Sequence, residues 1–107
     1  MTSADLDCLF CKIVAGDIPV EVLHRTDRVV AFRDVAPQAP THVLVVPVVH
    51  QPDAAASAAD DPAIVGDLVA AAAAIAAEEG VEGYRLVLNT GAEAGQTVFH
   101  THLHLLG

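Results

Sequence analysis

The sequence predicts an α+β fold in which a five-stranded, mainly antiparallel sheet carries one long helix and a short N-terminal helix. Strand-like segments come first, one long helical pattern follows, and two more strand-like segments end the chain. The 107 residues suffice for one domain with its own core, so we expect a single domain spanning 1–107. A hydrophobic content of 53% excludes a disordered chain.

The first elements are a short helix and two strands. Residues 8–15, CLFCKIVA, suit a helix that ends at the turn GDIP. VEVLHRTD, residues 20–27, and RVVAFRDV, residues 28–35, are expected to be strands. In the second strand Val30 and Phe32 share one face, and Val29 and Ala31 share the other.

A proline-containing loop and a third strand come next. Two prolines place residues 36–40, APQAP, in a loop. The apolar segment 41–50, THVLVVPVVH, is expected to be a strand that is interrupted at Pro47. Three strands in succession predict an antiparallel meander.

The clearest helix spans residues 61–79. Asp61 is a suitable N-cap, Pro62 suits the first helical position, and Gly80 is a suitable terminator. Apolar residues that recur at helical spacing should pack on the sheet: Ile64, Leu68, Ala71 and Ile75. Beyond the helix we expect a strand at 84–89, a glycine-containing loop at 90–97 and a last strand at 98–106.

Charge and composition exclude several classes of function. Fourteen acidic and five basic residues give a net charge of −9, which argues against nucleic-acid binding because phosphate backbones require clustered Lys and Arg. A small anionic ligand stays possible, since backbone N–H groups bind phosphate. The N-terminal segment lacks signal-peptide features, and the longest apolar run, LVAAAAAIAA, has ten residues and is too short to cross a membrane. We therefore expect a cytoplasmic protein with reduced thiols.

Three of the six histidines occur within FHTHLHLLG, at positions 100, 102 and 104. Side chains alternate along a strand, so these imidazoles should project from one face while Leu103 and Leu105 enter the core. Such a row indicates a metal site or nucleophilic and acid–base catalysis, with polar surface histidines as the plainest alternative. The preceding loop favours catalysis, because its glycines let backbone N–H groups approach an oxyanion.

The segment HTHLHLL resembles the His-x-His-x-His-x-x signature of the histidine-triad (HIT) family, with Thr101 where an apolar residue is usual. CLFCKIVAGDIP, AFRDVAPQAPTHVLVVP and GYRLVLNTGAEAGQTVFHTHLHLLG resemble successive blocks of its Hint branch. The resemblance implies a hydrolase that cleaves purine nucleoside phosphoramidates at the α-phosphorus. His102 would be the nucleophile that carries a covalent nucleotidyl group, and His104 and His42 would orient it and move protons.

The same resemblance implies the substrate-binding residues. Asp34 would bind the ribose hydroxyls. Three residues would contact the phosphate or the leaving group: Asn89, Gln96 and Thr97. Five would form the apolar slot around the base: Leu9, Phe10, Ile13, Phe32 and Val35. It also implies a homodimer.

Two other functions stay open at this point. A dinucleoside polyphosphate hydrolase of the Fhit type is one, because EAGQTV resembles that branch too. A purine-nucleotide-binding or scaffold module with little catalysis is the other.

Cys8 and Cys11 form a Cys-x-x-Cys pair that allows three interpretations. A thioredoxin-like redox pair is disfavoured because no βαβ context surrounds it. Two buried thiols or two ligands of a zinc ion are the alternatives. The resemblance implies a structural zinc whose other ligands are His50 and His100, and no cofactor for catalysis.

Overall fold

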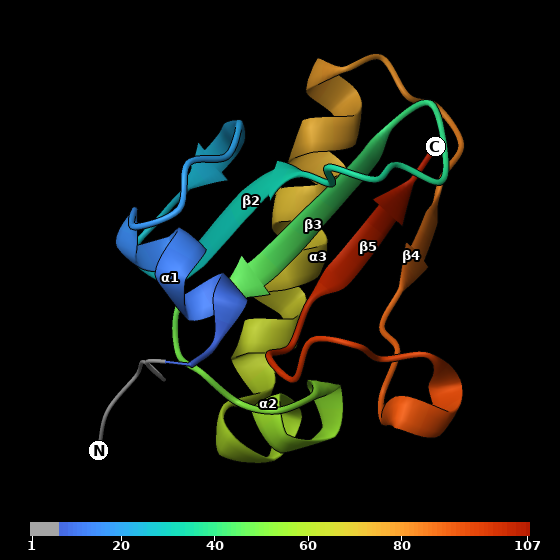
Figure 1. Ribbon diagram of the computed structural model, residues 1–107. Helices are drawn as coiled ribbons and strands as arrows, with labels where there is room; N and C mark the ends of the chain where they lie inside the picture. The colour runs from blue at the N-terminus through green and yellow to red at the C-terminus, as the bar shows by residue number, and fades with distance from the viewer. Residues whose placement is uncertain (1–6) are drawn as a thin grey trace.

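Helices cover both faces of a five-stranded sheet in the computed structural model, which describes residues 7–107 (Figure 1). The helices and strands, in chain order, are α1 Leu9–Ala15, β1 Val22–Arg25, β2 Val29–Arg33, β3 His42–Pro47, α2 Ala54–Asp60, α3 Pro62–Glu78, β4 Arg85–Val87 and β5 Leu103–Leu106. The strand order is β1-β2-β3-β5-β4, and each neighbouring pair is antiparallel. The expected fold class and the meander of the first three strands are confirmed. The expected domain and the N-terminal segment that lacks signal-peptide features both begin outside the described residues.

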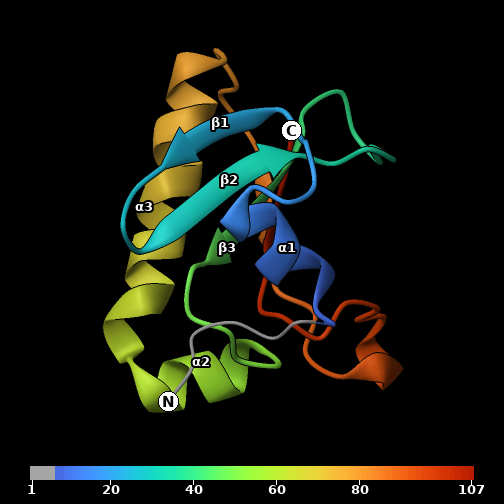
Figure 2. The same cartoon turned by 60° about the vertical axis from the view of Figure 1, so that its left-hand side comes forward.

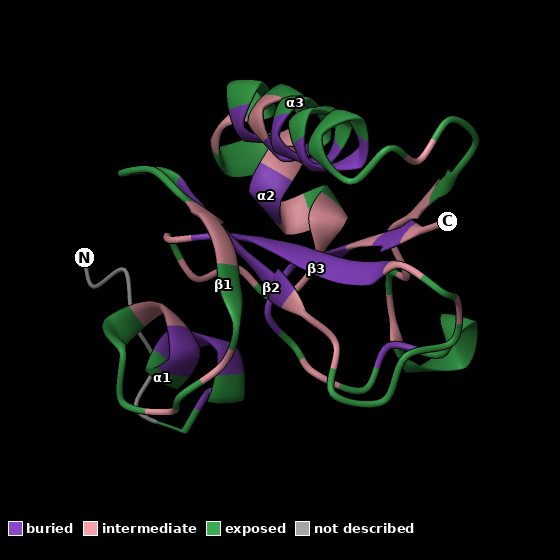
Figure 3. Cartoon of the chain, turned by 90° about the horizontal axis from the view of Figure 1, so that it is seen from above, coloured by how far each residue is buried: buried purple, intermediate pink, exposed green. Residues whose placement is uncertain are grey.

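Two separate cores lie on the two faces of the sheet, with α3 over one face and α1 over the other (Figures 2 and 3). The alternation in β2 divides its residues between them: Val29 and Ala31 face α3, and Val30 and Phe32 face α1. β5 contributes Leu103 and Leu105 to the α3 core, as the sequence predicts. His104, between these two leucines, is therefore left on the α1 side.

Local sequence signals place α3 where it was expected. The Asp61 side chain accepts a hydrogen bond from the Ala63 N–H, and Pro62 occupies the first helical position. Gly80, with φ of 70°, follows the helix in the left-handed region that glycine tolerates. The four apolar residues predicted to pack on the sheet are all buried in the α3 core.

The short helix α1 starts one residue later than expected, because Cys8 is its N-cap. The Cys8 Sγ accepts a hydrogen bond from the Cys11 N–H at 3.3 Å. Gly16, with φ of 84°, ends the helix. This cap fixes both thiols of the Cys-x-x-Cys pair on the first turn.

The predicted last strand, 98–106, is wrong in its first half, because β5 begins at Leu103. Its pairing with β3 ends at Val45 opposite Leu103. Continued pairing would set residue 101 opposite Pro47, which has no N–H to donate. His100 and His102 therefore precede the strand, and only His104 lies within it.

Helix α2 was not expected from the sequence. Its seven residues, AAASAAD, have no apolar periodicity, and its N-cap is Asp53, whose side chain accepts a hydrogen bond from the Ala56 N–H. The strands β1 to β4 are each shorter than predicted. Within the described part of the chain, no helix is both long and apolar enough to cross a membrane.

Candidate functional site

An open cavity of about 230 Å³ lies beside the histidine segment, against α1 and the end of β2. All five residues expected to surround a base line it: Leu9, Phe10, Ile13, Phe32 and Val35. Four polar residues with expected roles also line it: Asp34, Thr97, His102 and His104. Two hollows of larger volume within residues 7–107 are each lined by a single histidine, whereas two histidines line this cavity. Its lining residues, and not its volume, therefore distinguish it.

The structure places three predicted residues away from the cavity wall. His42 is buried behind it and contacts His104. Asn89, just after β4, is half-buried and does not line the cavity. Gln96 is buried, and its amide holds the loop: it accepts a hydrogen bond from the Gly91 N–H and donates to the carbonyls of Pro52 and Val98.

Four residues of the wall were not predicted: Val20, Arg33, Leu44 and Val98. The alternation of β3 was a usable signal for Leu44, because it lies two residues from His42 and so shares its face. Arg33 offers little to a ligand, since its guanidinium makes a two-point ion pair with Glu79 at 2.6 and 3.0 Å and a further one with Glu21.

His102 is held with one nitrogen protonated and the other available. Its Nδ1 lies 2.8 Å from the His100 carbonyl oxygen, and a carbonyl only accepts, so Nδ1 carries the proton. Burial lowers the pKa of His102, which keeps the ring neutral near neutral pH. In the neutral ring Nε2 then has a free lone pair. Phe10 packs edge-on against this ring, with centroids 5.0 Å apart.

His104 is coupled to His42 and to an acid. Its Nδ1 lies 2.9 Å from His42 Nε2, and that Nε2 lies 3.4 Å from a carboxylate oxygen of Asp34. Burial is the main cause that lowers the pKa of His104, and the nearby His102 and His42 lower it further. His104 Nε2 is buried without a hydrogen-bond partner among the described residues, while the His102 ring lies 4.9 Å away. A polar ligand in the cavity would supply the missing partner.

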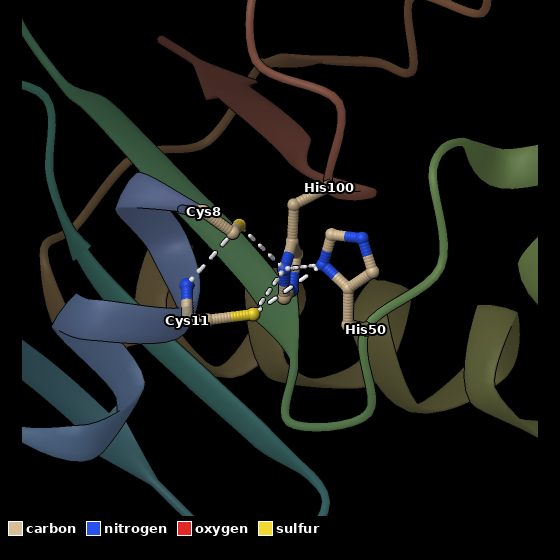
Figure 4. A group of neighbouring side chains, drawn as sticks. All are labelled: Cys8, Cys11, His50 and His100. Carbon is tan, nitrogen blue, oxygen red and sulfur yellow. Dashed lines mark hydrogen bonds between the residues drawn. The ribbon is translucent and has the colours of Figure 1, made fainter. Parts of the chain in front are cut away.

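The remaining triad residue points to a different cluster. His100 is buried, and its Nδ1 lies 3.4 Å from Cys8 Sγ, 3.5 Å from Cys11 Sγ and 3.1 Å from His50 Nδ1. Cys11 Sγ also lies 3.3 Å from His50 Nδ1. Figure 4 shows the four side chains converging from α1, from the loop after β3 and from the segment before β5.

The geometry of this cluster fits a tetrahedral zinc ion. Zinc bonds of about 2.0–2.1 Å to nitrogen and 2.3 Å to sulfur set neighbouring ligand atoms roughly 3.3–3.8 Å apart. Four of the six separations in the cluster are 3.1–3.5 Å, close to these edges, and all six lie within 4.8 Å. His100 Nε2 donates to the Pro47 carbonyl at 2.8 Å, so its Nδ1 is the unprotonated nitrogen. Burial lowers the pKa of His100 to about 4, which maintains that form.

Comparison with known proteins identifies the family. The HIT domain family matches residues 15–107. The chain belongs to the histidine-triad family. The triad is the segment that contains His100, His102 and His104, and the fold described above is the family fold.

Several relatives cover almost all of the chain. A purine nucleoside phosphoramidase of Escherichia coli is 42% identical over 103 residues, which are 94% of this chain and 87% of that protein. An uncharacterised HIT-like protein of Synechococcus elongatus is 48% identical over 102 residues, 94% of this chain and 90% of that protein. The crystal structure of a HIT family hydrolase from Legionella pneumophila has a TM-score of 0.90 at 44% identity, covering 94% and 92% of the two chains. A HIT family hydrolase from Clostridium thermocellum reaches 0.94 at 40% identity, covering 97% and 92%.

Thr101, the departure from the triad signature, has a partner that the sequence did not reveal. Its hydroxyl lies 2.6 Å from that of Ser57 on α2, and both residues are buried. The Thr101 N–H also donates to the Gln51 carbonyl at 3.0 Å. In this HIT protein Thr101 therefore connects α2 to the triad segment through a buried hydrogen bond.

Replacing Thr101 with valine is expected to reduce the free energy of unfolding by about 1–3 kcal/mol, because it leaves the buried Ser57 hydroxyl without this partner. Urea unfolding measures the change. The double variant with Ser57→Ala should recover part of the loss. A double-mutant cycle with a coupling below about 0.3 kcal/mol would show that the two hydroxyls do not interact.

Proposed function

We propose that this HIT hydrolase cleaves purine nucleoside phosphoramidates, of the adenosine 5′-phosphoramidate type, at the α-phosphorus through a covalent intermediate on His102. The observation that carries the proposal is the state of the His102 ring: its Nδ1–H is held by the His100 carbonyl, and its Nε2 lone pair is free at a cavity wall. The named activity of the Escherichia coli relative supports the substrate class.

The first step forms a bond between His102 Nε2 and the α-phosphorus and breaks the bond from phosphorus to the amine nitrogen. That nitrogen takes up a proton from the histidine network or from solvent and leaves as a neutral amine. A neutral imidazole is a competent nucleophile, and two displacements replace one difficult step. The buried Nε2 of His104, carrying the ring proton, would donate to a phosphoryl oxygen, which would satisfy its missing hydrogen bond.

The second step restores the enzyme. Water attacks the phosphorus, the bond to Nε2 breaks, and the water proton passes to the histidine network or to solvent. The products are a nucleoside 5′-monophosphate and free His102. An amine leaves readily once it is protonated, so phosphoramidates suit a site that is rich in imidazole and has no free arginine among its described wall residues.

The apolar part of the cavity would bind the base and Asp34 would bind the ribose. Phe10 and Ile13 on α1 and Phe32 on β2 are buried in the core between this helix and the sheet, which gives the slot a fixed shape. Asp34 Oδ1 accepts a hydrogen bond from the Ala36 N–H at 2.8 Å, which orients the carboxylate. This arrangement offers shape for a purine and two acceptor oxygens for the ribose hydroxyls.

We also propose that Cys8, Cys11, His50 and His100 hold a structural zinc ion. Four protein donors close such a site, so the ion would stabilise the packing of α1 and the triad segment and take no part in the reaction. A homodimer, the assembly that the family resemblance implies, is proposed as well, and light scattering of the purified protein would test it.

A substrate panel tests the proposed activity. An adenosine 5′-phosphoramidate is expected to be hydrolysed with a kcat/KM at least about 100-fold above that of a diadenosine polyphosphate, because a protonated amine is the better leaving group for this site. A preference for the dinucleotide would favour the Fhit-type activity. Tight AMP binding with negligible turnover of both substrates would favour a binding module.

A further inference from the structure

We infer that the backbone N–H of Gln38 determines which nitrogens of His42 and His104 carry protons, and so prepares the triad for its substrate. The inference rests on the proposed function for its catalytic meaning. The tautomers of His42 and His104 themselves do not depend on which substrate the protein hydrolyses. Gln38 lies in the loop between β2 and β3, and no catalytic or binding role was predicted for it.

The Gln38 N–H donates to His42 Nδ1 at 3.0 Å. A backbone amide has a hydrogen to give and no lone pair to accept with, so His42 Nδ1 must be the unprotonated nitrogen. The proton of a neutral His42 then lies on Nε2. A histidine tautomer is commonly set by the hydrogen bond that its other nitrogen makes.

The tautomer of His42 determines the tautomer of His104. The protonated Nε2 of His42 lies 2.9 Å from His104 Nδ1 and 3.4 Å from the Asp34 carboxylate. His104 Nδ1 therefore accepts, and the proton of the neutral His104 ring lies on Nε2. This is the buried nitrogen without a partner described above. The Gln38 amide, acting through His42, thus determines that His104 Nε2 carries the proton that would be donated to a phosphoryl oxygen.

The same amide argues against a metal ion at this end of the site. Ligand atoms of Asp34, His42 and His104 lie within 4.8 Å of one another, as they would around a bound cation. A metal on His42 Nε2 would require the proton to move to Nδ1, where it would point at the Gln38 N–H. Two hydrogens would then face each other in a buried contact. The structure thus separates a metal-competent cluster around His100 from a proton-carrying network around His104.

The loop that carries this amide is held on several sides. The Asp34 N–H donates to the His42 carbonyl at 3.0 Å, and the Asp34 side chain accepts from the Ala36 N–H. The Gln38 side chain donates to the Ala36 carbonyl at 3.1 Å. Prolines at positions 37 and 40 restrict the backbone on both sides. The amide is therefore positioned before substrate binds.

Histidine ¹⁵N NMR of the wild-type protein without substrate tests the tautomers directly. We expect a proton on Nε2 of both His42 and His104 and none on their Nδ1 atoms. A proton on His42 Nδ1 would overturn the inference. Because no substrate is present, this measurement stands apart from the test of the phosphoramidate activity.

Variants at residue 38 test the catalytic meaning. Gln38→Pro removes the N–H, and Gln38→Ala removes the side chain but keeps the N–H, so the two are compared with each other. We expect kcat/KM for an adenosine 5′-phosphoramidate to be at least tenfold lower in Gln38→Pro than in Gln38→Ala. In the NMR spectrum of Gln38→Pro, His42 should no longer show a single tautomer. An ester in place of the residue-38 amide, made by semisynthesis, removes the same hydrogen without the proline ring and should act like Gln38→Pro. Equal activity and unchanged tautomers in the ester variant would contradict the inference.

Discussion

Replacing His102 with alanine is expected to reduce kcat for an adenosine 5′-phosphoramidate by at least about 10³-fold, because loss of a nucleophile removes the covalent pathway. Steady-state kinetics gives the size of the loss. Rapid quenching followed by mass spectrometry should detect a nucleotidyl adduct on the wild-type protein and none on the variant.

A matched control separates the nucleophile from general effects of losing an imidazole. His24 lies on β1, away from the cavity, so His24→Ala should stay within about twofold of the wild type in kcat. Thermal unfolding of His102→Ala would show that the variant is folded. Turnover by folded His102→Ala within tenfold of the wild type would rule out His102 as the nucleophile.

Replacing Cys11 with serine is expected to abolish stoichiometric zinc binding and to lower stability by about 3 kcal/mol, because serine is a poor zinc ligand and the other three donors then lack their ion. For a domain of this size such a loss lowers the melting temperature by roughly 10–20 °C. Metal analysis of protein purified without chelator and thermal unfolding measure the two effects.

The Cys11 variant should also lose activity, because His100 connects the metal cluster to the nucleophile His102. The His100 side chain belongs to the cluster, while its carbonyl accepts from His102 Nδ1. His24→Ala again serves as the control, since that histidine lies outside the cluster and the zinc content should not change. Wild-type protein that contains no stoichiometric zinc after purification without chelator would exclude the proposed ion.

Much of the fold follows from local sequence signals. The ends of α3 depend on Asp61, Pro62 and Gly80, which act within one turn of the helix. The two faces of β2 follow from alternation along the strand. Such signals are readable because their cause lies within a few residues of the chain. Helix α2 has no comparable pattern beyond its cap.

The site was predictable in composition and much less so in arrangement. The apolar slot and the triad residues were named from the sequence and its family resemblance. The structure gathers the slot, His102 and His104 around one cavity and places His100 in the metal cluster instead. Gln96 differs, because its amide is hydrogen-bonded to three backbone groups, one of them the Pro52 carbonyl 44 positions away, and no sequence pattern indicates this pairing. Asn89 lies away from the cavity wall.

The sequence by itself determined that three histidines alternate and that the leucines on either side of the last one enter the core. Only the tertiary structure decided that His100 joins the metal cluster while His102 and His104 line the cavity. Pro47 on the neighbouring strand, fifty-four positions before Thr101, ends the pairing and leaves His100 free to turn toward Cys8 and Cys11. The proton positions were likewise decided by contacts from other segments: the His100 carbonyl for His102, and His42 with the Gln38 amide for His104. A one-dimensional pattern can specify which side chains occur on a face, whereas the partner of each nitrogen depends on which distant backbone groups the fold brings beside it.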